Sequence, residues 1–249
     1  MRTRQGKAIC SSATRNTFGI PIRDYVPHHE PFQHYQQDAN PHHLPPNSWA
    51  NIGRGDQASH QYDIQDFWHA LDRGNLPAVS FVKAPAALDG HAGYSGPLDE
   101  QAFLVDTLNR LEAAPEWGDM AIILAWDDSD GRYDHQMPRI VMGSATKADA
   151  HNRNGLCGKP SPDAYGGRCG HGPRLPLLVI SPYATPNFVD HTLVDQTSIL
   201  RFIEDNWGTG RIGNQSYDAM AGSLDGMFEF GRPSKTRVLT LDSCTGEPQ

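Results

Sequence analysis

Three stretches of the chain are mainly apolar and short: residues 77–83, 121–125 and 173–181. The middle one, AIILA, has no polar interruption and stops abruptly at two aspartates. Short apolar runs without alternation are typical of strands that are buried on both faces of a sheet. Pro176 should lie near the start of the third strand, because proline cannot donate to a strand ladder.

Three other stretches carry apolar residues at helical spacing: residues 64–71, 99–112 and 195–207. Gly74 and Asn75 follow the first helix, whereas Asp195 precedes the third helix as a cap and Gly208 ends it. The order strand, helix, strand over residues 77–125 predicts a parallel pair with a right-handed crossover. Residues 237–241 are expected to add an edge strand.

The remaining stretches lack such patterns. Residues 1–24 show no periodicity and are expected to form an irregular N-terminal segment. Residues 36–61 are rich in His, Pro, Asn and Gln, which is typical of a long surface loop. No repeat or linker divides the rest, so we expect one domain.

Composition narrows the range of functions. The 249 residues could make one large α/β domain or a piece of a larger one, and 24 Gly and 19 Pro indicate long loops. A formal charge of -8 argues against nucleic acid as a partner. No apolar stretch approaches the roughly 18 residues that a membrane span needs. Residues 1–7 are basic, but the apolar core of a signal peptide does not follow them.

The four cysteines, Cys10, Cys157, Cys169 and Cys244, have no zinc-binding spacing. Cys157 and Cys169 bracket a loop that is rich in Gly and Pro. A disulfide across this loop, which would imply an oxidising compartment, and two separate thiols are both compatible with the sequence.

Titratable residues follow the predicted strands. Asp127 and Asp128 follow the strand at 121–125 after Trp126, where adjacent carboxylates suit a divalent metal; the alternative is an acidic turn. His28, His29 and His91 lie on loops, and imidazoles can bind an anion or donate a proton to a leaving group. The GxSxG and GxxxxGK[ST] motifs are absent. Together these features fit hydrolysis of phosphate esters better than acyl transfer.

Four blocks of sequence resemble the bacterial phosphoesterase family, which contains phospholipases C and acid phosphatases related to the alkaline phosphatase superfamily. The blocks, in order along the chain, are PHHEPF (27–32), DGHAGYS (89–95), WDDSDGRYDH (126–135) and GPRLPLLVISPY (172–183). The resemblance runs from about residue 25 to residue 207.

The resemblance implies a three-layer α/β/α sandwich with a mostly parallel sheet and hydrolysis of phosphate esters with a divalent metal of unknown identity. Asp127 and Asp128 match a pair of metal-binding carboxylates. His29 and His91 match histidines that contact the substrate phosphate, with His28 beside them. The implied partner is a phospholipid head group or a soluble monoester, and the implied location is secreted or periplasmic.

Other polar residues of these blocks receive lesser roles. Asp130, Asp134 and His135 are assigned to loop structure or to support of the metal ligands. His191, which follows Asp190, is assigned to structure.

One departure from the family pattern is important. The family's first metal-ligating pair, Glu-Asn, and its Ser or Thr nucleophile lie upstream of these blocks, and this chain has no Glu-Asn dipeptide. We therefore expect residues 25–249 to correspond to the C-terminal part of the domain, with an incomplete sheet and little or no activity without an N-terminal half or companion chain. A non-catalytic phosphate- or phosphocholine-binding module is the alternative, and a calcium-binding structural protein ranks last.

Overall fold

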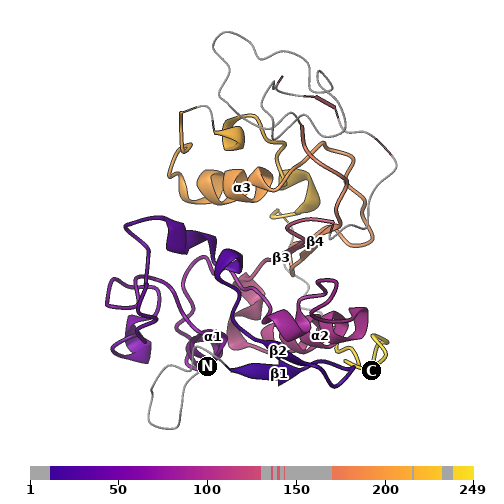
Figure 1. Cartoon of the computed structure of the whole chain (residues 1–249). Helices are drawn as coiled ribbons and strands as arrows, with labels where there is room; N and C mark the ends of the chain where they lie inside the picture. Colours follow the sequence, from indigo (N-terminus) through magenta and orange to yellow (C-terminus); the bar gives the residue numbers. More distant parts are fainter. Residues whose placement is uncertain are drawn as a thin grey trace. The chain divides into compact units, whose positions relative to one another are not determined.

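The structure is a computed structural model of the chain (Figure 1). It describes residues 12–129, 136, 139–140, 143, 170–214, 216–231 and 238–249. The chain divides into two compact units, which are described separately below: unit 1 comprises residues 1–120 and 236–249, and unit 2 comprises residues 121–235. Both helices and strands are present, which confirms the predicted α/β content.

Unit 1 begins with a hairpin that the sequence analysis did not predict. Strands β1 (Ala13–Arg15) and β2 (Pro21–Arg23) pair antiparallel. The side chain of Asn16 holds the connection, because its Oδ1 accepts hydrogen bonds from the backbone N–H groups of Phe18 (3.1 Å) and Ile20 (3.0 Å). Its Nδ2 donates to the carbonyl of Tyr94 at 2.9 Å, which ties the hairpin to a distant loop.

Asp99 joins this hairpin to helix α2 (Pro97–Glu112). Its Oδ2 accepts from the N–H of Gly96 (2.8 Å), at the helix N-cap, and from the hydroxyl of Thr17 (3.0 Å). Its Oδ1 accepts from the N–H of Thr17 at 2.8 Å. A carboxylate in the first turn also interacts favourably with the helix dipole. The predicted helix at 99–112 is thus confirmed, with Pro97 at its first position.

The other predicted helix of unit 1 is also confirmed. Helix α1 (Ile64–Leu71) ends before Gly74, which has a φ of +62°. Arg110 of α2 reaches this end of α1 and donates to both carboxylate oxygens of Asp72, at 2.8 and 2.9 Å. The same guanidinium lies over the ring of Trp68, 4.4 Å from its centroid. A single nitrogen, Nη2, makes both hydrogen bonds, and together with the cation–π contact it connects the two helices.

The C-terminal residues pack along α2, although we expected an edge strand. Asn109 pairs with both backbone groups of Leu241, at 2.8 and 2.9 Å, and Glu112 accepts from the N–H of Leu239 at 2.9 Å. Helix side chains therefore satisfy the backbone groups that a neighbouring strand would have satisfied. Within the described residues 238–241, the edge strand is absent and only Leu241 forms a bridge, with Pro248.

The predicted strand at residues 77–83 is wrong. This stretch forms no strand in the described structure, and Phe81 is 57% exposed. Because a strand requires a partner for its backbone groups, an apolar sequence alone does not produce one. The expected parallel crossover to residues 121–125 consequently does not form.

Unit 2 contains strands β3 (Ile122–Ala125) and β4 (Leu177–Ile180), which pair antiparallel with Ile123 opposite Val179. Both predicted strands are confirmed, and Pro176 immediately precedes β4. Neither strand has a fully buried residue, and Leu178 is 44% exposed, so the expected burial on both faces is wrong. Among the described residues, every strand pair is antiparallel, so the mostly parallel sheet and the three-layer sandwich are not confirmed.

Helix α3 (Thr197–Trp207) confirms the third predicted helix. The side chain of Asp195 accepts from the backbone N–H of Thr197 at 2.8 Å, and Gly208, with a φ of +63°, ends the helix. Phe202 of this helix stacks on Phe228, with ring centroids 4.9 Å apart. None of the helices in the described part of the chain combines the length and apolar character that a membrane span requires.

Replacing Asp99 tests the link between the hairpin and α2. We expect Asp99→Ala to lower the free energy of unfolding by about 3 kcal/mol, because the buried N–H of Gly96 and the two donors of Thr17 lose a charged acceptor. The measurement is urea unfolding followed by circular dichroism. Asp106→Ala, at an exposed position of the same helix, is the matched control and should change stability by less than about 0.5 kcal/mol. Equal effects of the two substitutions would contradict this role.

The same carboxylate should contribute to acid sensitivity. Burial alone would raise the pKa of Asp99, but the hydrogen bonds from Gly96 and Thr17 lower this pKa below its ordinary value. A lowered folded-state pKa gives stability that is present above the unfolded pKa, about 3.9, and is lost as the pH falls through the folded pKa. The loss of stability between about pH 5 and the folded pKa should therefore be smaller in Asp99→Ala than in the wild type.

Candidate functional site

The His28–His29 pair lies on a single 3-10 turn, η1 (Pro27–His29). Pro27 starts the turn, and the N–H of His29 donates to the carbonyl of Val26 at 3.0 Å. The two imidazole rings meet edge to face, with centroids 4.7 Å apart. His28 is exposed, whereas the side chain of His29 is only 13% exposed. Burial raises the pKa of the next residue, Glu30.

The second loop is organised by Asp89. Its Oδ1 accepts from the N–H of His91 at 2.9 Å and from the hydroxyl of Ser95 at 3.0 Å. The Oγ of Ser95 in turn accepts from the N–H of Gly90 at 2.7 Å. Gly90 has a φ of +77°, and a Cβ there would lie 2.6 Å from a carboxylate oxygen of Glu100. Glycine therefore suits this position both for its conformation and for its space.

The ring of His91 is fixed by two contacts. Its Nδ1 lies 2.8 Å from the carbonyl oxygen of Ala92. Because a carbonyl only accepts, Nδ1 carries a proton in this contact. The ring also stacks on Tyr94, with centroids 4.4 Å apart. These contacts orient an imidazole that can act through its other nitrogen.

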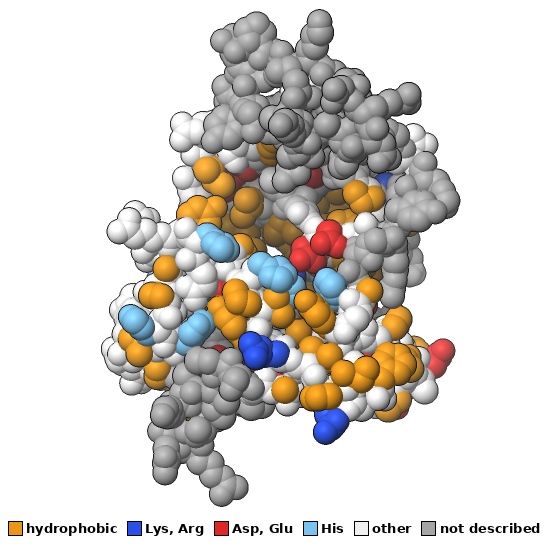
Figure 2. Space-filling view, in the orientation of Figure 1, with side chains coloured by type: hydrophobic (Ala, Val, Ile, Leu, Met, Phe, Trp, Pro, Cys, Tyr) orange, Lys and Arg blue, Asp and Glu red, His pale blue; other side chains and the backbone are white. Residues whose placement is uncertain are grey.

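Asp89 brings the two histidine loops together within unit 1. Its Oδ2 lies 3.9 Å from the Nδ1 of His29, while its Oδ1 holds the loop that carries His91. The Asp89 side chain is only 8% exposed. Asp89 begins the DGHAGYS block and was not among the predicted site residues, although an Asp two residues before a His is a recognisable turn signal. Figure 2 shows histidine side chains among apolar ones on the visible surface.

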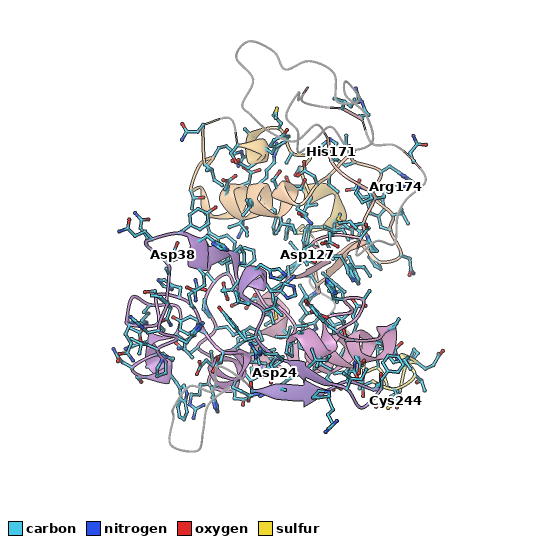
Figure 3. All side chains as sticks on the ribbon, viewed as in Figure 1. Asp24, Asp38, Asp127, His171, Arg174 and Cys244 are labelled. Atoms are coloured by element: carbon cyan, nitrogen blue, oxygen red, sulfur yellow. The ribbon has the colours of Figure 1, made fainter. Side chains whose placement is uncertain are left out.

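Asp127 and Asp128 belong to unit 2, where both are exposed and follow β3 after Trp126. Figure 3 labels Asp127. The side chain of Gln196 fixes this segment, because its Nε2 donates to the carbonyls of Trp126 (2.9 Å) and Asp127 (2.7 Å). The preceding residue, Asp195, pairs with the Nδ1 of His171 at 3.3 Å. The start of α3 therefore anchors the residues that follow β3.

The described residues do not by themselves make a metal site. Among them, no group of three or more His, Cys, Asp or Glu side chains could hold an ion. Asp127 and Asp128 supply two carboxylates, and a hard divalent cation takes six or more oxygen ligands. Asp130, Asp134 and His135 lie outside the described residues, as do Cys10, Cys157 and Cys169, so the disulfide alternative is not addressed.

The Asp190–His191 segment forms a turn. Asp190 accepts from the N–H of Thr192 at 2.8 Å, and hydrogen bonds from Thr192 lower the pKa of Asp190. His191 is exposed. The candidate residues thus divide between the units: His28, His29 and His91 belong to unit 1, and Asp127 and Asp128 belong to unit 2.

Comparisons with known proteins agree with the blocks noted in the sequence. The phosphoesterase family model matches residues 8–210. A non-hemolytic phospholipase C of Pseudomonas aeruginosa is 32% identical over 174 residues, which cover 64% of this chain and 24% of that protein. Phospholipase C B of Mycobacterium tuberculosis is 28% identical over 179 residues, covering 71% and 34% respectively.

The similarity extends to plants. Non-specific phospholipase C3 of Arabidopsis thaliana is 29% identical over 141 residues, which cover 53% of this chain and 24% of that protein. The chain therefore spans only about a quarter to a third of the length of these relatives.

Replacing Gln196 tests the anchor of the segment after β3. We expect Gln196→Ala to speed amide hydrogen exchange at residues 127–129 severalfold, while global stability changes by no more than about 1 kcal/mol, because the hydrogen bonds are exposed. Asn206→Ala, at an exposed position of the same helix, is the control. Unchanged exchange at residues 127–129 would show that Gln196 does not restrain them.

Proposed function

The chain belongs to the phosphoesterase family, and from this membership we propose that it forms part of a hydrolase of phosphate esters, of the phospholipase C or acid phosphatase type. The family match carries the proposal, since residues 8–210 include all five candidate residues. The shared carboxylate of Asp89 supports it, because this group brings two histidine loops to one place in unit 1.

We assign His29 and His91 to the oxygens of the substrate phosphate. Protonated imidazoles bind anions through charge-assisted hydrogen bonds, and one of them can give its proton to the leaving oxygen. His28 stands beside His29 and receives a secondary role. The edge-to-face contact means that the orientation of one ring restricts that of the other.

We assign Asp127 and Asp128 as two ligands of a divalent metal. Such an ion neutralises phosphoryl oxygens and activates a nucleophile. The fit is partial, because the described residues hold no third ligand beside these carboxylates. We propose that the remaining ligands and the nucleophile come from an upstream part of the enzyme, whether an N-terminal half or a companion chain.

The strands of unit 2 support the need for a further part of the domain. A two-stranded pair such as β3–β4 is marginal by itself, and stable sheets have three or more strands. We propose that residues 25–249 are the C-terminal part of a phosphoesterase domain whose added strands complete a three-layer α/β/α sandwich. Backbone edges of the β3–β4 pair would then receive partners.

The substrate class and location follow from the family. We propose a phospholipid head group or a soluble phosphate monoester as substrate, acted on by a secreted or periplasmic enzyme. The negative charge of the chain, -8, disfavours nucleic acid as the phosphate ester.

A non-catalytic module that binds phosphate or phosphocholine is the second candidate. The observation that favours it is the metal fit: two exposed carboxylates without a third ligand among the described residues would bind an ion weakly. The two candidates agree on phosphate binding by this chain and differ on turnover once the missing parts of the enzyme are present.

Phosphate binding tests what the two candidates share. We expect inorganic phosphate to shift the imidazole signals of His29 and His91 in nuclear magnetic resonance spectra, and His29→Ala to weaken binding about tenfold or more, since a charge-assisted hydrogen bond is lost. His42→Ala, at an exposed loop position of unit 1, is the matched control. If phosphate moves neither signal, the assignment of these histidines is wrong.

Turnover tests whether the chain is active without further parts of the enzyme. The substrates are p-nitrophenyl phosphate and p-nitrophenyl phosphorylcholine, assayed over pH and divalent metals with the purified chain and with Asp127→Ala. We expect no turnover by the folded chain alone. Turnover that Asp127→Ala abolishes would mean that the chain supplies its own nucleophile, and our account of missing parts would be wrong.

A further inference from the structure

The carboxylate of Asp89 is held in one orientation. Its Oδ1 accepts two hydrogen bonds, from the N–H of His91 (2.9 Å) and the hydroxyl of Ser95 (3.0 Å). Ser95 is itself fixed by the N–H of Gly90, at 2.7 Å. Rotation of the carboxylate would break both hydrogen bonds to Oδ1, so the position of Oδ2 is determined by this loop.

The other oxygen of Asp89 is buried without a hydrogen-bond donor among the described residues. The side chain is more than nine-tenths buried, and the nearby charge partner is the Nδ1 of His29, 3.9 Å from Oδ2. Leaving a buried carboxylate oxygen without a donor is unfavourable. A distance of 3.9 Å is too long for a hydrogen bond, but a movement of less than 1 Å would close it to the usual range.

We propose that Asp89 is a positioning residue that holds His29 with its Nδ1–H toward the carboxylate and so directs Nε2 to the phosphate. This inference rests on the proposed function for the role of Nε2, but the state of the ring itself does not depend on it. A carboxylate beside Nδ1 favours the tautomer with the proton on that nitrogen, and it also favours the charged ring that binds an anion.

The arrangement explains why one residue connects the two histidine loops. A single side chain orients the ring of His29 through Oδ2 and fixes the backbone of His91 through Oδ1. Next to His29 along the chain lie His28, whose ring contacts it, and Glu30, whose pKa is raised by burial. Among the described contacts, neither of these groups is held by two hydrogen bonds, whereas Asp89 is.

The test replaces Asp89 by its neutral isostere, Asp89→Asn. The readout is the tautomer of His29, from imidazole nitrogen shifts of the full chain labelled with ¹⁵N-histidine, at a pH where the ring is neutral. We expect the wild-type ring to be mainly protonated at Nδ1, and the ratio of Nδ1–H to Nε2–H to fall about tenfold in Asp89→Asn. Asp106→Asn removes the same charge at an exposed position and should leave the tautomer unchanged.

Phosphate affinity gives the second readout. A partner that orients a ligating histidine is worth about 10- to 100-fold in affinity at metal sites, and we expect Asp89→Asn to weaken inorganic phosphate binding about tenfold. Circular dichroism establishes that the variant is folded. A folded Asp89→Asn with an unchanged tautomer ratio and unchanged phosphate affinity would overturn the inference.

The two proposals fail in different ways. If the wild-type chain does not bind phosphate, the proposed function fails, and the tautomer ratio still decides the role of Asp89. If Asp89→Asn does not fold, the wild-type spectrum alone is decisive: a neutral His29 protonated mainly at Nε2 contradicts the inference, and one protonated mainly at Nδ1 supports it.

Discussion

Buried carboxylates that must be supplied with hydrogen-bond donors determine how the loops of unit 1 are arranged. Asp99 accepts from Gly96 and from both donors of Thr17, so the hairpin is fixed at the start of α2. Asp89 accepts from His91 and Ser95, so the loop at residues 89–95 folds back on itself. Few apolar side chains are fully buried in these segments, and directional hydrogen bonds therefore decide their positions.

The same requirement explains where strands form and where they do not. Each backbone N–H and carbonyl needs a partner, which β3 and β4 provide for each other. Residues 238–241 obtain theirs from Asn109 and Glu112 of α2 and remain outside any sheet. Residues 77–83 have the apolar composition of a strand, but they form no strand in the described structure.

These cases show which features could be predicted from the sequence. The three helices depend on local spacing and on caps such as Asp195 and Gly208, so their positions were predicted to within two residues. The hairpin depends on Asn16 and its bond to Tyr94, 78 residues away, and hydrophobic periodicity does not report such a contact. Strand pairing is likewise non-local. Composition therefore indicated where strands could form, but neither which strands pair nor whether they pair parallel or antiparallel.

The residues of the candidate site were predicted from sequence motifs and not from hydrophobic periodicity. His29, His91 and the Asp127–Asp128 pair were chosen by motif, and the family match includes them without assigning their roles. Asp89 was overlooked because its significance lies in the 3.9 Å separation from His29, which joins residues 60 positions apart. Sequence patterns identify reactive side chains more readily than the groups that orient them.

The geometry of Asp89 links folding to the proposed chemistry. One oxygen is saturated by loop hydrogen bonds, which stabilise the fold, while the other is buried beside an imidazole at a distance longer than a hydrogen bond. An arrangement chosen for stability alone would give both oxygens a close donor. Natural proteins tolerate such local cost mainly at functional sites. The incomplete satisfaction of Asp89 is therefore itself an argument that this corner of unit 1 is built to present a histidine.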